Sequence, residues 1–121
     1  MAKHLELGKK GEAAAVRYLE KLRYRIIERN YRCRLGEVDI IALDRGTIVF
    51  VEVKTRSTAG YGSPEMSITI RKQRQLVRVA LSYLQNHNLL HRDARFDVVA
   101  VRQGEQNQDM YLIKNAFEIS P

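Results

Sequence analysis

Two neighbouring stretches of the chain, residues 36–43 and 47–54, are rich in valine, isoleucine and phenylalanine. Such β-branched and aromatic side chains suit the half-buried surface of a sheet, so we expect each stretch to form a strand. The three residues between them, Asp-Arg-Gly at 44–46, are typical of a tight turn. The pattern therefore predicts a β-hairpin in the middle of the chain.

The other periodic stretches predict two helices and three further strands. A helix is expected from about residue 5 to 22, where one face would carry Gly8, Gly11, Glu12, Ala15, Leu19 and Leu22. A second is expected at 70–86, with an inward stripe of Gln73, Leu76, Val77, Ala80, Leu81 and Leu84. Strands are expected at 24–31, 95–101 and 110–113. This order predicts a single domain over residues 1–121 with an α/β or α+β layer fold and a mixed central sheet of about five strands.

The predicted hairpin carries charged residues where apolar ones would be expected. If its loop is the two residues 45–46, Asp39 lies opposite Glu52 and Glu37 lies opposite Lys54. A three-residue loop without a bulge would instead put Asp39 and Glu52 on different faces. We favour the first register, which brings the two carboxylates together. Burying such charges is costly unless they are paired or bind a metal, so they indicate a functional site.

Two carboxylates at one point repel each other unless one protonates or a cation lies between them. Aspartate and glutamate oxygens suit Mg²⁺ or Mn²⁺, which proteins commonly hold with one or two carboxylates and substrate phosphates. Lys54, two residues beyond Glu52, can hold a phosphate oxygen or orient an attacking water. These are the parts that metal-assisted phosphodiester hydrolysis requires.

The spacing of Asp39 and Glu52-Val53-Lys54 resembles the bipartite motif of the PD-(D/E)XK nuclease superfamily, with Val38 in place of the usual proline. The chain as a whole resembles the YraN-like family of small bacterial proteins, which is similar to archaeal Holliday junction resolvases. The matching stretches cover nearly the whole chain in the family's order. They are residues 8–14 (GKKGEAA), 30–32 (NYR), 36–42 (GEVDIIA), 49–56 (VFVEVKTR) and 95–101 (RFDVVAV).

The resemblance implies a restriction-endonuclease-like core and a Mg²⁺- or Mn²⁺-dependent endonuclease acting on DNA, including branched repair or recombination intermediates. It implies that Glu12, Asp39 and Glu52 hold the metal with the backbone carbonyl of Val53, and that Lys54 completes the catalytic set. It also implies a homodimer that places two sites on its substrate. Glu12 shares its helical stripe with small and apolar residues, which favours an inward position. The alternative is a first-turn acid that interacts with the helix dipole.

The charge balance favours a polyanionic partner. The chain has 21 lysines and arginines against 14 acidic residues, a formal net charge of +7 and a sequence pI of about 9.8. Candidate nucleic-acid contacts flank the hairpin or lie on the second helix, and are Arg29, Arg32, Arg34, Arg56, Arg71, Lys72, Arg74 and Arg78. A plain solvated face is the alternative for the helical stripe. By resemblance, Lys72 and Gln75 lie near positions where related nucleases contact substrate.

Two other classes of protein remain open on this sequence. One is a nucleic-acid-binding module that keeps the fold without catalysis. The other is a structural protein in which a Glu37–Lys54 contact, with Arg56 near Glu52, forms an internal ion-pair network. The N-terminus lacks the apolar segment of a signal peptide, no stretch is long enough to span a membrane, and the single Cys33 fits a reducing environment, so we expect a cytoplasmic protein. Asp97, inside an apolar strand, is expected to pair with an arginine.

Overall fold

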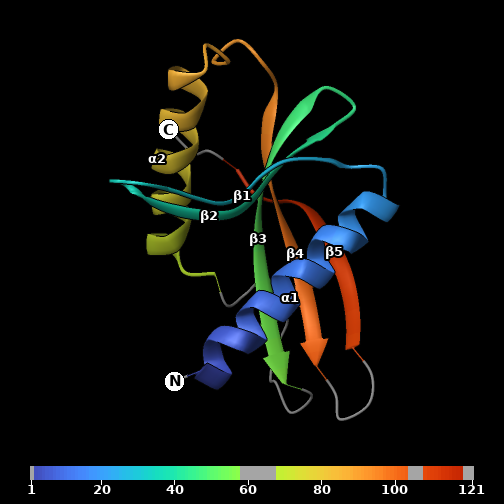
Figure 1. Cartoon of the computed structure of the whole chain (residues 1–121). Helices are drawn as coiled ribbons and strands as arrows, with labels where there is room; N and C mark the ends of the chain where they lie inside the picture. The colour runs from blue at the N-terminus through green and yellow to red at the C-terminus, as the bar shows by residue number, and fades with distance from the viewer. Residues whose placement is uncertain (1, 58–67, 104–107, 119–121) are drawn as a thin grey trace.

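The computed structural model of the chain describes residues 2–57, 68–103 and 108–118, with side chains for 11–55, 68–102 and 108–118. Its elements, shown in Figure 1, are α1 (Ala2–Lys21), β1 (Arg25–Cys33), β2 (Gly36–Asp44), β3 (Thr47–Ser57), α2 (Ile70–Asn86), β4 (Ala94–Gln103) and β5 (Gln108–Phe117). The predicted order of helices and strands is confirmed. The boundaries of α2 match the prediction, and Thr69 caps its N-terminus.

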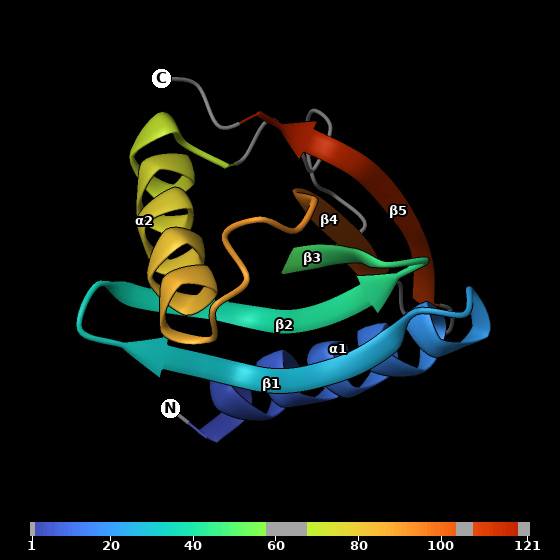
Figure 2. The same ribbon diagram turned by 90° about the horizontal axis from the view of Figure 1, so that it is seen from above.

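The five strands form one mixed sheet in the order β1-β2-β3-β4-β5. Neighbouring strands are antiparallel except β3 and β4, which run parallel and are joined through α2. The two helices cover opposite faces of the sheet, as Figure 2 shows from above. The chain is therefore an α+β protein whose mixed five-stranded sheet between two helices is consistent with a restriction-endonuclease-like core.

Each helix packs against one face of the sheet and forms a separate hydrophobic core with it. Under α1, Ala15 and Leu19 pack on side chains of β2, β3 and β4. Under α2, Leu76, Val79 and Tyr83 pack on the other face, where Phe50 makes edge contacts with the Tyr83 ring. Burial on both faces explains why β3 reads as a nearly continuous apolar stretch rather than an alternating one.

The predicted hairpin register is confirmed where β2 and β3 pair. Asp44 lies opposite Thr47 across a two-residue turn, and the paired positions continue to Ile40 opposite Val51. The ladder then ends, so Asp39 and Glu52 occupy the next positions, where the two strands separate. The expectation that Glu37 lies opposite Lys54 is wrong, because beyond this point β2 pairs only with β1.

An irregularity in β1 marks the same point of the sheet. Asn30 has a left-handed backbone, with φ of 54°, and lies between two regular pairs of the β1–β2 ladder, across from Asp39. Val38 and Ile40 would share a face in a regular strand, yet Val38 packs under α2 and Ile40 under α1. The backbone of β2 therefore turns about its axis at Asp39, which lets this side chain face the gap between β2 and β3.

Two details of the predicted helix faces are wrong. Leu22 lies beyond the end of α1 and is 43% exposed, and Leu81 of α2 is also 43% exposed. Val79 and Tyr83, which were not in the predicted stripe, are buried instead. Leu81 lies about 200° around the helix from Val79, so the two cannot both face the sheet.

Candidate functional site

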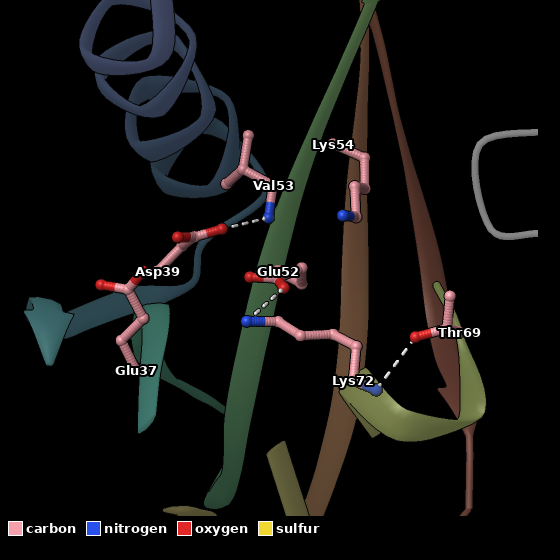
Figure 3. A pocket seen from close by; sticks show the side chains of 7 residues that line it. All are labelled: Glu37, Asp39, Glu52, Val53, Lys54, Thr69 and Lys72. Atoms are coloured by element: carbon pink, nitrogen blue, oxygen red, sulfur yellow. Dashed lines mark hydrogen bonds and ion pairs between the residues drawn. The ribbon is translucent and has the colours of Figure 1, made fainter. Parts of the chain in front are cut away.

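The separation of β2 from β3 opens a groove of about 410 Å³ at the N-terminal end of α2. Figure 3 shows the side chains that line it, which come from three elements. Strand β2 contributes Glu37 and Asp39, β3 contributes Glu52, Val53 and Lys54, and the start of α2 contributes Thr69 and Lys72. The groove thus gathers three acidic and two basic side chains from segments distant in the sequence.

The Asp39 carboxylate is fixed by the backbone of β3. The Val53 N–H donates a 2.8 Å hydrogen bond to Asp39 Oδ2, as Figure 3 shows. On its other side, Val53 belongs to the parallel ladder with β4, where it is paired with Val99. The carboxylate therefore takes the place that a β2 backbone carbonyl would hold if the strands had stayed together, and it lies beside Glu52.

Glu52 is a buried acid, with only 6% of its surface exposed. Burial raises the pKa of its carboxyl, and the hydrogen bond and negative charge of Asp39 raise it further, to about 8; the charges of Lys72 and Lys54 act in the opposite direction. In the absence of another cation, the pair favours a shared proton near neutral pH. A divalent cation would remove this repulsion.

Lys72 reaches the buried Glu52 carboxylate from α2, across the groove from β3. Its Nζ is 3.4 Å from Glu52 Oε2 and donates a 3.2 Å hydrogen bond to Gln75 Oε1. Helical geometry puts Lys72 on the side of α2 that also carries the buried Leu76 and Val79. Because Lys72 lies in the first turn of α2, just beyond the sheet core, this inward side faces the groove.

Glu12 is held near the pair by the close approach of α1 to β3. A Cβ at Gly11 would lie 2.9 Å from Thr55 Oγ1, so glycine lets the helix come this near. Glu12 Oε1 is buried and accepts no hydrogen bond from the part of the chain that the structure describes. Burial raises the pKa of Glu12 most, and the negative charge of Asp39 raises it further. The positive charges of Arg29 and Arg32 lower it. Glu12 lies in the middle of α1, so the first-turn alternative is wrong.

The carboxylate oxygens at the groove supply some, but not all, of the ligands that a hard divalent cation needs. Asp39 and Glu52 form a close pair of carboxylates, and the buried Glu12 oxygen lacks a partner within the described residues. Among the described side chains, however, no three acidic, histidine or cysteine groups already converge as a finished metal site. Two carboxylates are enough for a magnesium ion that also uses water and substrate oxygens. The two carboxylates therefore fit Mg²⁺ or Mn²⁺ as part of a ligand set that other oxygen atoms would complete.

The predicted nucleic-acid contacts fall into separate groups. Arg29, Arg32 and Arg34 are exposed on the β1–β2 hairpin, and the first two are near enough to affect Glu12. Arg32 Nε forms a 3.0 Å ion pair with Glu37, which replaces the expected Glu37–Lys54 contact.

The arginines of α2 lie elsewhere. Arg71, Arg74 and Arg78 are exposed along the side of α2 that faces away from its buried stripe. The structure therefore does not bring these three side chains to the carboxylates. The side chain of Arg56 lies outside the described part of the chain.

A second groove, of about 350 Å³, adjoins the first. It is lined by Arg32, Cys33, Gly36, Glu37, Lys72 and Gln75. Gly36 has a φ of +144°, and a Cβ there would lie only 2.7–2.8 Å from atoms of the Gln75 side chain. Apolar periodicity gave no reason to single out this contact between the hairpin and α2. The glycine at the start of a strand was its only signal in the sequence.

Asp97 has a structural role, as expected. It is 1% exposed and accepts hydrogen bonds from the Tyr24 hydroxyl (2.8 Å), the Arg95 side chain (3.0 Å) and the Asn115 N–H (3.0 Å). Arg95 also forms a 2.6 Å ion pair with Asp44. This network joins β2, β4 and β5 to Tyr24, the residue before β1, and includes none of the residues that line the groove.

The fold and the groove define an α+β protein whose five-stranded mixed sheet is consistent with a restriction-endonuclease-like core and which carries a carboxylate pair where two of its strands separate. The chain belongs to the uncharacterised protein family UPF0102, whose model matches residues 11–101. This confirms the resemblance to the YraN-like family. The chain is 53% identical over 115 residues to a UPF0102 protein of Geobacter sulfurreducens, covering 94% of this chain and 90% of the relative.

Other relatives match at similar length. A UPF0102 protein of Geobacter metallireducens is 51% identical over 114 residues, covering 94% of this chain and 93% of its own. One of Caldicellulosiruptor saccharolyticus is 52% identical over 114 residues, covering 93% and 97%. Within the described residues, neither helix is both long and apolar enough to cross a membrane.

Proposed function

We propose that this protein is a metal-dependent endonuclease that hydrolyses phosphodiester bonds in DNA. One observation carries the proposal: Asp39 and Glu52 lie against each other at an open groove although their charges repel. A fold gains no stability from such a pair, and sites of this kind are where sequences depart from good packing. Lys54 lines the same groove, so acidic and basic groups needed for phosphoryl chemistry lie together.

Asp39 and Glu52 would hold Mg²⁺ or Mn²⁺, with Glu12 and the Val53 carbonyl as further ligands. When bound, the metal supplies a Lewis acid and lowers the pKa of water. The Val53 N–H keeps the Asp39 carboxylate in place before any cation arrives, because their 2.8 Å hydrogen bond already exists. Orientation of this ligand therefore costs little when the metal binds.

Lys54 would act on the reacting phosphate. Its positive charge lowers the pKa of Glu52, which places its ammonium group near the carboxylate pair. From there it can orient the attacking water or offset the negative charge that grows on the phosphate oxygens. Both roles require a cation in the groove, which is where Lys54 lies.

The β1–β2 hairpin would hold the DNA backbone. Arg29, Arg32 and Arg34 are exposed on this hairpin and Arg32 lines the second groove, and guanidinium groups bind phosphates through paired hydrogen bonds. The net charge of +7 favours the approach of any polyanion. By similarity to resolvases, we propose that branched DNA is a substrate and that a homodimer presents two sites to it.

The test is cleavage of single-stranded, duplex, flapped and four-way-junction DNA with Mg²⁺ or Mn²⁺. Glu52→Gln, purified in parallel, is nearly isosteric and controls for a contaminating nuclease. Asp109→Asn removes an exposed acid on β5 and should keep full activity. Cleavage that needs metal and disappears only in Glu52→Gln supports the proposal, and equal cleavage by wild type and Glu52→Gln contradicts it.

A binding module without catalysis is the second candidate. It is favoured by the Lys72–Glu52 ion pair, which already gives the buried acid a cation. This candidate predicts salt-sensitive binding to DNA with no cleavage of any substrate in either metal. It also predicts that Glu52→Gln binds DNA as well as wild type does.

A further inference from the structure

Lys72 lies between the two adjoining grooves. Glu37 and Lys72 are the residues that line both the carboxylate groove and the second groove. The lysine side chain has a flexible four-carbon stem, so its ammonium group can turn from one groove to the other without moving α2.

The present contacts of Lys72 are suited to exchange. Its Nζ lies 3.4 Å from Glu52 Oε2, longer than the 2.7–2.9 Å that is usual for a strong charged hydrogen bond. The Lys72 side chain is 28% exposed, whereas that of Glu52 is 7% exposed. Gln75 accepts the second hydrogen bond at 3.2 Å and is itself a lining residue of the second groove. The ammonium group is therefore held loosely between an acceptor of each groove.

We propose that Lys72 is a built-in counter-ion which a divalent metal displaces. Without metal, it partly neutralises Glu52; with metal, it turns into the second groove and binds the phosphate next to the one that is cleaved. This inference rests on the function proposed above, because it assumes that the carboxylates bind a metal. It adds to that function a coupling by which metal binding strengthens DNA binding.

Simple electrostatics supports the exchange. A divalent cation interacts more strongly with two carboxylates than a single ammonium group does, and the two cations repel each other at this distance. Once released, Lys72 joins Arg32 at the second groove, where Arg32 alone is already paired with Glu37, so the added ammonium group gives a phosphate a net positive charge to bind. Metal binding therefore strengthens DNA binding, and DNA must strengthen metal binding by the same factor.

The first experiment measures Mn²⁺ affinity by calorimetry without DNA. In Lys72→Met the competing cation is gone, so we expect Mn²⁺ to bind about fivefold to tenfold more tightly than in wild type, while the metal-free protein melts at a lower temperature. Lys72→Arg keeps the charge and should bind Mn²⁺ as wild type does. Arg71→Met removes a charge from the neighbouring exposed position and should change the affinity less than twofold.

The second experiment measures binding of a short duplex oligonucleotide by anisotropy, in a Lys54→Met background to prevent cleavage. Without metal, Lys72→Met should bind DNA nearly as well as its parent, because Lys72 is occupied by Glu52. With Mn²⁺, the parent should gain affinity by about fivefold or more and Lys72→Met should gain much less.

The outcomes separate the two proposals. If wild type binds Mn²⁺ but Lys72→Met binds it equally or more weakly, Lys72 is not a competing cation and this inference alone is overturned. If wild type binds no Mn²⁺, the proposed metal-dependent function is overturned with it. Tighter Mn²⁺ binding in Lys72→Met but not in Arg71→Met supports the inference whether or not a cleaved DNA has been found.

Discussion

The Asp39 carboxylate accepts a 2.8 Å hydrogen bond from the backbone N–H of Val53, although the two residues belong to strands that have already separated. This hydrogen bond has two roles. It satisfies a backbone donor that the β2–β3 ladder leaves unpaired, and it holds one carboxylate against another. The site is thus built from the same feature that ends the hairpin.

Asp39→Asn should stabilise the metal-free protein. The amide oxygen can still accept the Val53 N–H, while the negative charge beside Glu52 is lost. We expect a gain of about 1 kcal/mol in the free energy of unfolding, which is about 4 °C in melting temperature for a chain of this length. The same change should abolish stabilisation by Mn²⁺. Thermal melts with and without Mn²⁺ measure both effects.

Asp44→Asn is the matched control for that substitution. Asp44 is also a strand carboxylate of β2, but it holds Arg95 through a 2.6 Å ion pair at the other end of the strand. Its replacement should lower the melting temperature and leave the Mn²⁺ response intact. If Asp39→Asn behaves like Asp44→Asn, the carboxylates belong to a structural ion-pair network instead of a metal site.

The stability of the metal-free protein should fall as pH rises from about 4.5 to about 8. Glu52 has an ordinary pKa of 4.5 when unfolded and about 8 when folded, because it is buried beside Asp39 and only partly offset by Lys72 and Lys54. In this window the folded state binds more protons, so the free energy of unfolding decreases with pH. Glu12, whose pKa is also raised, acts in the same direction.

Denaturant titrations between pH 5 and 9 measure this effect, which is on the order of a few kcal/mol. Glu52→Gln should remove most of the slope, and Mn²⁺ should reduce it. The pKa of Asp44 is lowered by Arg95, so its contribution is lost only in more acidic solution and does not overlap this window. A wild-type curve that is flat or rises between pH 5 and 8 would contradict the buried carboxylate pair.

Much of this architecture follows from local pattern, but the opening of the groove and the position of Lys72 do not. The turn at 44–46 and the alternating direction of side chains along any strand were enough to predict that Asp39 and Glu52 come together. The divergence of β2 was not predicted from these patterns; it occurs at Asp39, across from the left-handed backbone of Asn30 in another strand. Likewise, Lys72 reaches Glu52 only because α2 lies over the end of β3, which no spacing in the sequence reports.

Glu12 gives a prediction on metal affinity. Its Oε1 is buried without a hydrogen-bond partner in the described part of the chain, so a bound cation would give it a ligand role. Glu12→Gln should leave the metal-free melting temperature unchanged or raise it, and should weaken Mn²⁺ binding by about tenfold. Glu20→Gln, an exposed position on the same helix, should alter neither. A loss of stability with unchanged Mn²⁺ affinity would make Glu12 an anchor of α1 and not a ligand.

Gly36→Ala should destabilise the protein for two separable reasons. The φ of +144° is unfavourable for any residue with a side chain, and the new methyl group would meet the Gln75 side chain at 2.7–2.8 Å. We expect a loss of about 1–3 kcal/mol in the free energy of unfolding, measured by denaturant titration. Because Gln75 accepts a hydrogen bond from Lys72, the second groove should also be disturbed.

Gly46→Ala isolates the backbone contribution, since its φ is +89° but nothing lies within 4 Å of the added Cβ. It should cost less than Gly36→Ala. Adding Gln75→Ala to Gly36→Ala removes the clash but not the strain, so it should restore part of the lost stability, and the double-mutant cycle gives the steric share. Equal losses at the two glycines, with no recovery in the double variant, would mean that the hairpin does not press on α2.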